Sequence, residues 1–126
     1  DSGVKISLII RGICCLYPQR KNLSENIKVI SIIGHFLEHS RIFWFCNNGN
    51  NEVFIGSADW MRRNLDRRIE AVTPIEDYEL KCKIYSLLQT YIKDDYFSWI
   101  MKEDGSYSKY ELDSSDNRSQ IDLIEK

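Results

Sequence analysis

The chain has 126 residues, of which 43% are hydrophobic and 29% charged. This length and composition suit a globular domain and exclude wholesale disorder. The longest apolar run, residues 6–17, is interrupted by Arg11 and Gly12 and is too short to cross a bilayer core of about 30 Å. We therefore expect no transmembrane segment.

The formal net charge of -2 is unevenly divided along the chain. Residues 1–75 hold ten Lys or Arg and seven Asp or Glu, net +3, whereas residues 76–126 hold seven and twelve, net -5. Such a balance is too weak for bulk nucleic-acid binding. It favours a compact anion site, built from a few converging arginines, in the first part of the chain.

Strand-like patterns dominate the first part of the chain. Residues 4–10, 27–33 and 39–46 are rich in β-branched or alternating apolar residues, and we expect the first of these strands to be buried on both faces. The run Asn47–Asn51 contains Asn and Gly, which tolerate positive φ, and predicts a hairpin. Its return strand is expected at residues 52–55.

The remaining pattern adds helices to these strands, which indicates an α/β fold in a single domain, with a mixed β-sheet flanked by helices. The longest predicted helix, at residues 76–93, has apolar residues at helical spacing, and we expect that face to pack on the sheet. The other predicted elements are a helical turn at 60–64, a strand at 67–72 that Pro74 ends, a hairpin of strands at 97–101 and 106–112, and a terminal helix near 121–124.

The four cysteines, Cys14, Cys15, Cys46 and Cys82, show no C-x-x-C spacing. Adjacent cysteines are also poorly placed for a disulfide with each other. We expect reduced thiols that behave as small buried hydrophobic groups, as is typical of cytosolic proteins.

The two histidines, His35 and His39, lie four residues apart, and with Glu38 they match the H-x-x-E-H pattern of inverted zinc peptidases. That motif requires a helix which carries both ligands. Gly34 precedes the segment and a β-rich run follows it, so we expect no metal site here.

A longer pattern also begins at His39. His39-x-Arg41 is followed, after the predicted hairpin, by Gly56-Ser57-Ala58-Asp59. The pattern resembles the H-x-K…G-S-x-N signature of the phospholipase D superfamily, in which an imidazole and a cation meet a phosphoryl group. Arg41 keeps the cation, whereas Cys46 stands where that signature has Asp and Asp59 where it has Asn. These departures argue against ordinary phosphodiesterase chemistry.

Four blocks of the sequence resemble the last domain of polyphosphate kinases. They are VKISLIIRGICCL (4–16), LSENIKVISII (23–33), FLEHSRI (36–42) and VFIGSADWMRRNLDRRIE (53–70). The resemblance is detailed over residues 4–75 and general over 76–126. It implies that residues 1–126 are the C-terminal, phospholipase-D-like domain of such a kinase, and the start at Asp1 rather than Met agrees with an excised domain.

The resemblance implies an enzyme that reversibly transfers the γ-phosphate of ATP, through a phosphohistidine, to inorganic polyphosphate. The phosphohistidine and the Mg²⁺ ligands would lie in upstream domains, so this chain would supply half of the active site and be inactive alone. A cytoplasmic homo-oligomer that binds ATP or ADP is implied, with peripheral membrane association as an open alternative. The other functions we consider are a phospholipase-D-type phosphodiesterase and a non-catalytic polyphosphate-binding module.

The resemblance also implies which residues handle phosphate. Arg11 and His39 match family positions that contact ATP or the transferring phosphate, and we expect His39 to be catalytic, as a proton donor or an electrostatic stabiliser. Permanently charged guanidinium groups suit phosphate oxygens. Because side-chain direction repeats every two residues in a strand, Arg41 is expected to share a face with His39, and Arg68 with Glu70. Arg41 and Arg68 are thus further candidates for binding phosphate. Glu70 and Ser57 are expected to be supporting residues, Ser57 because it lies where the chain could approach phosphate closely.

Overall fold

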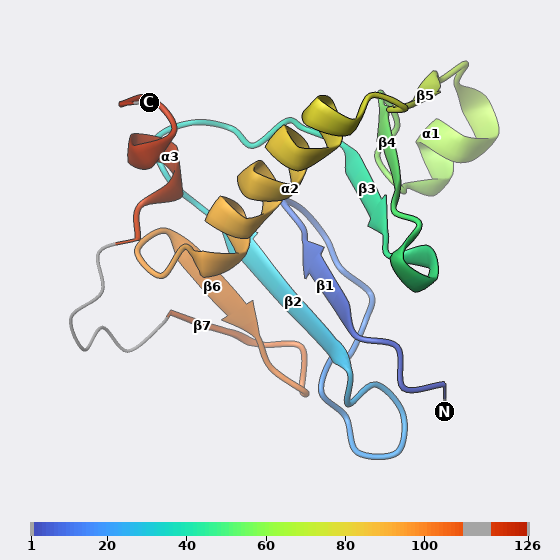
Figure 1. The fold of residues 1–126 in the computed structure, drawn as a ribbon. Coiled ribbons are helices and arrows are strands. Elements are labelled where there is room, and N and C mark those ends of the chain that lie inside the picture. Colours follow the sequence, from blue (N-terminus) through green and yellow to red (C-terminus); the bar gives the residue numbers. More distant parts are fainter. Residues whose placement is uncertain (1, 110–116, 126) are drawn as a thin grey trace. The chain divides into compact units, whose positions relative to one another are not determined.

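The computed structural model describes residues 2–109 and 117–125 (Figure 1). The chain is divided into two compact units, one of residues 1–38 and 87–126 and the other of residues 39–86. The α/β fold class is confirmed. The strands, however, form two sheets, where the sequence predicted one mixed sheet.

The first unit contains a four-stranded sheet in the order β1-β2-β6-β7. β1 runs parallel to β2, and the other neighbours are antiparallel. Val29, Ile30 and Ile32 in β2 are buried, whereas Ile6 in β1 is 38% exposed. The prediction that the first strand is buried on both faces was therefore wrong, because β1 is an edge strand and β2 lies inside the sheet. The strands are β1 (Ile6–Ile9), β2 (Ile27–Ile32), β6 (Ser98–Met101) and β7 (Tyr107–Lys109).

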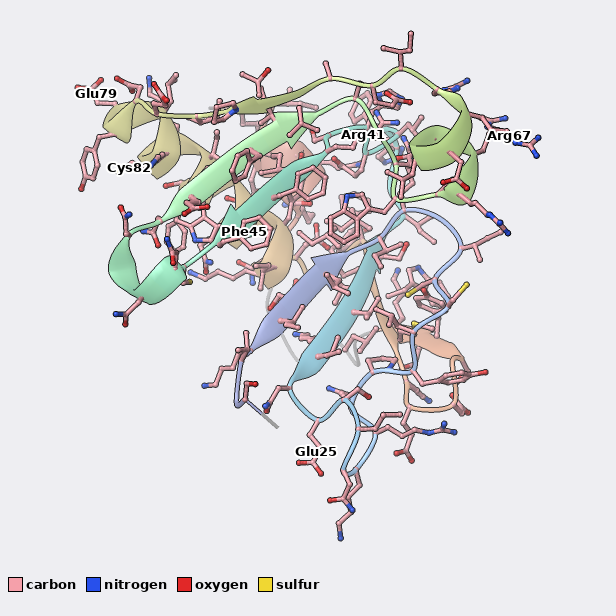
Figure 2. All side chains as sticks on the ribbon, turned by 90° about the vertical axis from the view of Figure 1, so that its right-hand side faces the viewer. Glu25, Arg41, Phe45, Arg67, Glu79 and Cys82 are labelled. Carbon is pink, nitrogen blue, oxygen red and sulfur yellow. The ribbon has the colours of Figure 1, made fainter. Side chains whose placement is uncertain are left out.

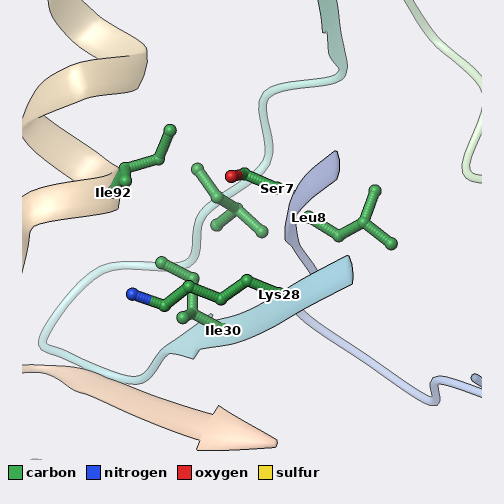
Figure 3. Close-up of a pocket in the computed structure, with 6 residues that line it drawn as sticks. Ser7, Leu8, Lys28, Ile30 and Ile92 are labelled. Atoms are coloured by element: carbon green, nitrogen blue, oxygen red, sulfur yellow. The ribbon is translucent and has the colours of Figure 1, made fainter. Parts of the chain in front are cut away.

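Helix α2 (Tyr78–Lys93) is the predicted long helix. Its first turn is capped by Asp77, whose Oδ1 accepts a hydrogen bond from the backbone N of Leu80 at 2.8 Å. Glu79 in the first turn and Lys93 in the last complement the helix dipole. Ile92 lines a small cavity of about 10 Å³ with side chains of β1 and β2 (Figure 3), which agrees with an apolar face directed at this sheet. That volume suits one water molecule and no larger ligand.

The C-terminal part of the first unit is held together by Asp94, which follows α2 and is 1% exposed. Its Oδ1 accepts hydrogen bonds from the backbone N of Phe97 at 2.7 Å and of Ser98 at 2.9 Å. Its Oδ2 accepts from Ser119 N at 2.7 Å and Ser119 Oγ at 2.5 Å. One carboxylate thus joins the end of α2, the start of β6 and the first residue of α3 (Ser119–Asp122), the terminal helix that the sequence predicted.

The small hairpin of β6 and β7 was also predicted, although residues 110–112 of its expected second strand lie outside the described residues. Gly105 has a φ of 86° in its turn. Next to it, the Ser106 hydroxyl and then the Ser106 backbone N–H donate to the Asp104 carboxylate and lower the pKa of that group. The turn therefore has its own local hydrogen bonds.

The second unit is an antiparallel sheet in the order β3-β4-β5, with α1 between β4 and β5. The Asn-rich hairpin is confirmed: its turn contains the 3-10 helix η1 (Asn47–Gly49), in which Asn48 has a φ of 51° and Gly49 of 91°. Trp44 on β3 also lies against Tyr85 of α2, with ring centroids 5.1 Å apart. The other elements of the unit are β3 (Ile42–Phe45), β4 (Glu52–Gly56), α1 (Arg62–Arg67) and β5 (Val72–Pro74).

The strand predicted at residues 67–72 was wrong. Helix α1 continues to Arg67, and the strand begins only at Val72 and includes Pro74, which was expected to end it. Pro74 is tolerated because β5 pairs only with β4 and is an edge strand.

The prediction of buried cysteines was also wrong. Cys15, Cys46 and Cys82 are exposed, and Cys14 is partly exposed. Ile13 and Leu16 beside the first pair are 85% and 42% exposed, because the chain runs over the surface of its unit after β1. As for membrane spans, the helices of the described residues are all too short or too polar to cross a bilayer.

We expect Asp94→Ala to lower the free energy of unfolding by about 2–4 kcal/mol, because it leaves buried N–H and O–H donors without an acceptor. Urea denaturation measures this. Asp66→Ala is the matched control, since the Asp66 carboxylate pairs with Arg62 at the surface and such pairs contribute little. Equal destabilisation by the two substitutions would contradict the role of Asp94.

Candidate functional site

Three chain segments meet at one end of the β3-β4-β5 sheet. The Gly56 N–H donates to the carbonyl of Arg41 at 3.0 Å, and the Ser57 N–H donates to the carbonyl of Ala71 at 3.0 Å. The residues before β3, after β4 and before β5 are therefore neighbours. Gly56 suits this crowded place, because a Cβ there would lie 3.2 Å from the Ala71 carbonyl oxygen.

Arg41 and Asp59 form a two-pronged ion pair at this end of the sheet. Arg41 Nε donates to Asp59 Oδ1 at 3.0 Å, and Arg41 Nη2 donates to Asp59 Oδ2 at 3.2 Å. The side chains are 14% and 33% exposed. Figure 2 shows Arg41 at the end of β3 that is nearer to α1. The bidentate contact fixes the plane of the guanidinium group.

The third nitrogen of Arg41 contacts His39. Arg41 Nη1 donates to the carbonyl of His39 at 2.7 Å and lies 2.7 Å from His39 Nδ1 and 3.2 Å from Nε2. A guanidinium has donors only, so a ring nitrogen that accepts from it carries no proton. His39 is exposed. The arrangement presents an accessible imidazole, held against a cation that Asp59 fixes.

The strand at residues 39–46 was predicted too long. β3 begins at Ile42, so His39 and Arg41 do not share a strand face. Their side chains nevertheless come together, through the hydrogen bonds of the guanidinium group. Asp59 was noticed only as a departure from the phospholipase D signature, and its pairing with Arg41 was missed. The available signal was the joint replacement of Lys by Arg and of Asn by Asp, since these two residues form a fork.

Ser57 and Glu70, predicted as supporting residues, are in direct contact. The Ser57 hydroxyl donates to the Glu70 carboxylate and accepts from the Ala71 N–H at 3.0 Å. Glu70 lies in the segment before β5 rather than on a strand. Together they stabilise the place where β4 and β5 stop pairing.

Arg68 is not brought to this cluster by any contact among the described residues. It follows α1 with an extended backbone, φ -127° and ψ 155°, and is exposed, so its predicted strand face with Glu70 does not exist. The arginines of α1, Arg62, Arg63 and Arg67, are exposed as well, and Figure 2 shows Arg67 pointing outward. Arg62 pairs with Asp66 at 3.2 Å, with side chains 96% and 55% exposed. This basic surface is separate from the Arg41 pair.

Arg11 lies in the first unit, just after β1. Its Nη1 donates to the carbonyl of Glu38 at 3.1 Å. The contact ties the end of β1 to the segment that directly precedes His39 in the chain. Arg11 and His39 belong to different units of the chain.

The H-x-x-E-H segment is not helical: residues 34–36 form a bend and residues 37–41 are extended or irregular. His35 packs edge-on against Phe97, with ring centroids 5.9 Å apart, whereas His39 contacts Arg41. Over residues 2–109 and 117–125, no three His, Cys, Asp or Glu side chains converge as metal ligands would. The segment therefore lacks the helical geometry that the zinc motif requires.

Comparison with known proteins gives one consistent family. The sequence model described as "Polyphosphate kinase C-terminal domain 2" matches residues 1–120. A polyphosphate kinase of Parasynechococcus marenigrum is 54% identical over 127 residues, covering 99% of this chain and 18% of that protein. One from Prochlorococcus marinus is 59% identical over 124 residues, covering 97% of this chain and 17% of that protein.

A solved structure agrees. The crystal structure of polyphosphate kinase from Porphyromonas gingivalis superimposes with a TM-score of 0.91 at 40% identity, covering 98% of this chain and 19% of that chain. The chain thus spans about a fifth of the length of the relatives it matches. The match also extends into the acidic C-terminal part, where the resemblance drawn from the sequence was only general.

We expect Arg41→Lys to lower the free energy of unfolding by about 1–2 kcal/mol, because a single ammonium group cannot satisfy both Asp59 oxygens and the His39 carbonyl. Denaturation curves of the variant and the parent measure this. Arg62→Lys is the control, because Arg62 also pairs with an Asp but is 96% exposed. A loss as large in the control would show that the Arg41 fork contributes nothing special.

Proposed function

Because the chain belongs to the polyphosphate kinase C-terminal domain 2 family, we propose that it is the C-terminal part of an enzyme that reversibly transfers the γ-phosphate of ATP, through a phosphohistidine, to inorganic polyphosphate. The phosphohistidine lies in upstream domains of the same polypeptide in this proposal. The present chain supplies one half of the active site, and its partners are ATP or ADP, polyphosphate and those upstream domains.

The observation that carries this proposal is the exposed His39 imidazole held against the Arg41–Asp59 pair. Phosphoryl transfer depends mainly on positioning and on neutralising the charge of the transferring group. An accessible imidazole can donate or accept a proton near pH 7, and an adjacent fixed cation favours the phosphate oxygens. His39 therefore acts as proton donor or electrostatic stabiliser, opposite the upstream phosphohistidine.

Arg11 is proposed as a second phosphate-binding residue, acting from the first unit. A guanidinium group at the end of a strand can fork onto phosphate oxygens. Arg68 is retained as a candidate only for its charge and exposure, since no contact among the described residues links it to His39.

Mg²⁺ is proposed to be bound by residues outside this chain. This part of the proposal rests on the family resemblance alone. A cytoplasmic homo-oligomer, with or without peripheral membrane association, completes the proposal.

A phospholipase-D-type phosphodiesterase is the weaker alternative. Such enzymes use two His-containing motifs, and this chain has one, with Asp59 in the position of Asn. A non-catalytic polyphosphate-binding module would use the same cations without turnover. The names of the relatives favour the kinase over both.

We expect His39→Gln in the full-length protein to reduce ATP-dependent polyphosphate synthesis by about 100-fold or more, because acid–base groups contribute on the order of 10²–10⁴ in rate. The measurement is initial rate at saturating ATP. His35→Gln is the matched control, since the His35 ring packs on Phe97 in the first unit. Unaltered turnover of the His39 variant would refute the assignment.

The 126-residue chain alone is expected to synthesise no polyphosphate from ATP and Mg²⁺, because the histidine that accepts the phosphoryl group is upstream. The purified chain is assayed beside the full-length protein at equal molarity. Robust synthesis by the chain alone would contradict the division of the site between domains.

A further inference from the structure

Gln120, on α3, is a buried polar residue that the sequence did not single out. It is 4% exposed. Its Nε2 donates to the carbonyl of Phe36 at 2.7 Å and to Glu38 Oε1 at 2.8 Å, and its Oε1 accepts from the backbone N of Phe36 at 3.0 Å. Both amide N–H groups and the amide oxygen are used. These partners also fix the orientation of the amide, because the Phe36 N–H needs an acceptor and its carbonyl needs a donor.

Gly34 makes room for this amide. A Cβ at position 34 would lie 2.2 Å from Gln120 Oε1 and 2.7 Å from Gln120 Cδ. Gly34 is not among the residues with positive φ, so its value here is the missing side chain rather than backbone freedom.

Gln120 is itself well anchored. The preceding residue, Ser119, gives both its N–H and its hydroxyl to the buried Asp94 carboxylate. The amide of Gln120 therefore extends from a fixed helix start to the segment at residues 36–38. Because its backbone is anchored in this way, the Gln120 side chain loses little further rotamer freedom when it contacts residues 36–38.

Glu38 connects Gln120 to Arg11. Its side-chain oxygen accepts from Gln120 Nε2, and its main-chain carbonyl accepts from Arg11 Nη1 at 3.1 Å. Gln120 thus holds Phe36 and Glu38 on both sides of Leu37, and so fixes the direction of the carbonyl that Arg11 contacts. All of these groups belong to the first unit.

We propose that Gln120 is a positioning residue, which orients the Arg11 guanidinium for phosphate through Glu38. The proposal rests on the proposed function only for the role of Arg11 in binding ATP. Arginine has many rotamers, and a guanidinium that is already oriented binds phosphate with a smaller entropic cost.

The experiment is a double-mutant cycle in the full-length protein, with the Kd for ATP and kcat/KM for ATP as readouts. In the parent we expect Gln120→Ala to raise the Kd for ATP and to lower kcat/KM by about tenfold each, the scale of removing a partly buried hydrogen bond. In an Arg11→Ala background we expect Gln120→Ala to change the Kd for ATP and kcat/KM by less than about twofold, because the effects of substitutions at coupled residues are not additive. Glu125→Ala, at the exposed end of the same segment, is the control and is expected to be unchanged.

Glu38 supplies a second test that does not create a buried cavity, in case Gln120→Ala fails to fold. Glu38→Ala should reproduce the weakening, whereas Glu38→Gln should restore ATP binding, because its amide oxygen still accepts from Gln120. Equal fold-changes for Gln120→Ala in both backgrounds, or normal ATP binding by Glu38→Ala, would overturn the inference about Gln120. Either result would leave the proposed role of Arg11 in place. Normal ATP binding by Arg11→Ala would overturn the proposed role of Arg11 and this inference with it.

Discussion

The buried carboxylate of Asp94 is the interaction on which much of the first unit depends. A charge that is 1% exposed is tolerated only when its lone pairs are satisfied, and here four donors from two segments, residues 97–98 and Ser119, satisfy them. The carboxylate fixes the turn after α2 and the start of α3 at once. Ser119 directly precedes Gln120 in the chain. The Asp94 carboxylate therefore also positions Gln120, whose side-chain amide holds residues 36–38. A network from Asp94 to Arg11 is built from hydrogen bonds rather than from apolar packing.

Local signals predicted local structure well. The run of Asn and Gly at residues 47–51 predicted the β3-β4 turn because few other residues accept the positive φ values found there. Helix α2 combined a capping Asp77 with apolar residues at helical spacing. The failure at residues 67–72 has an equally local cause: alternation over a short stretch cannot distinguish the end of α1 and an extended connection from a strand. The Pro74 signal misled, because an edge strand can contain it.

The candidate site was predictable in some of its members but not in its geometry. The motif singled out His39 and Arg41, whereas Asp59 was noticed only as a departure from it, and the three residues meet through the guanidinium fork rather than on a shared strand face. Gln120 could not have been found in this way, because its partners lie 82 and 84 residues away in sequence. The local trace of that contact is Gly34, a glycine whose φ is not positive and whose missing side chain leaves room for the amide.

The pairing of Arg41 with Asp59 also explains why two departures from the phospholipase D signature occur together. An Asn at position 59 would turn an NH₂ group toward one prong of the guanidinium, donor against donor, so only a carboxylate satisfies both Nε and Nη2. A Lys at position 41, in turn, could contact only one of the two Asp59 oxygens. Arg41 with Asp59 is thus a matched set. Because the Asp59 carboxylate and the His39 carbonyl fix the guanidinium, Arg41 is a cation held beside the His39 imidazole, and His39, Arg41 and Arg11 are the groups proposed to meet phosphate.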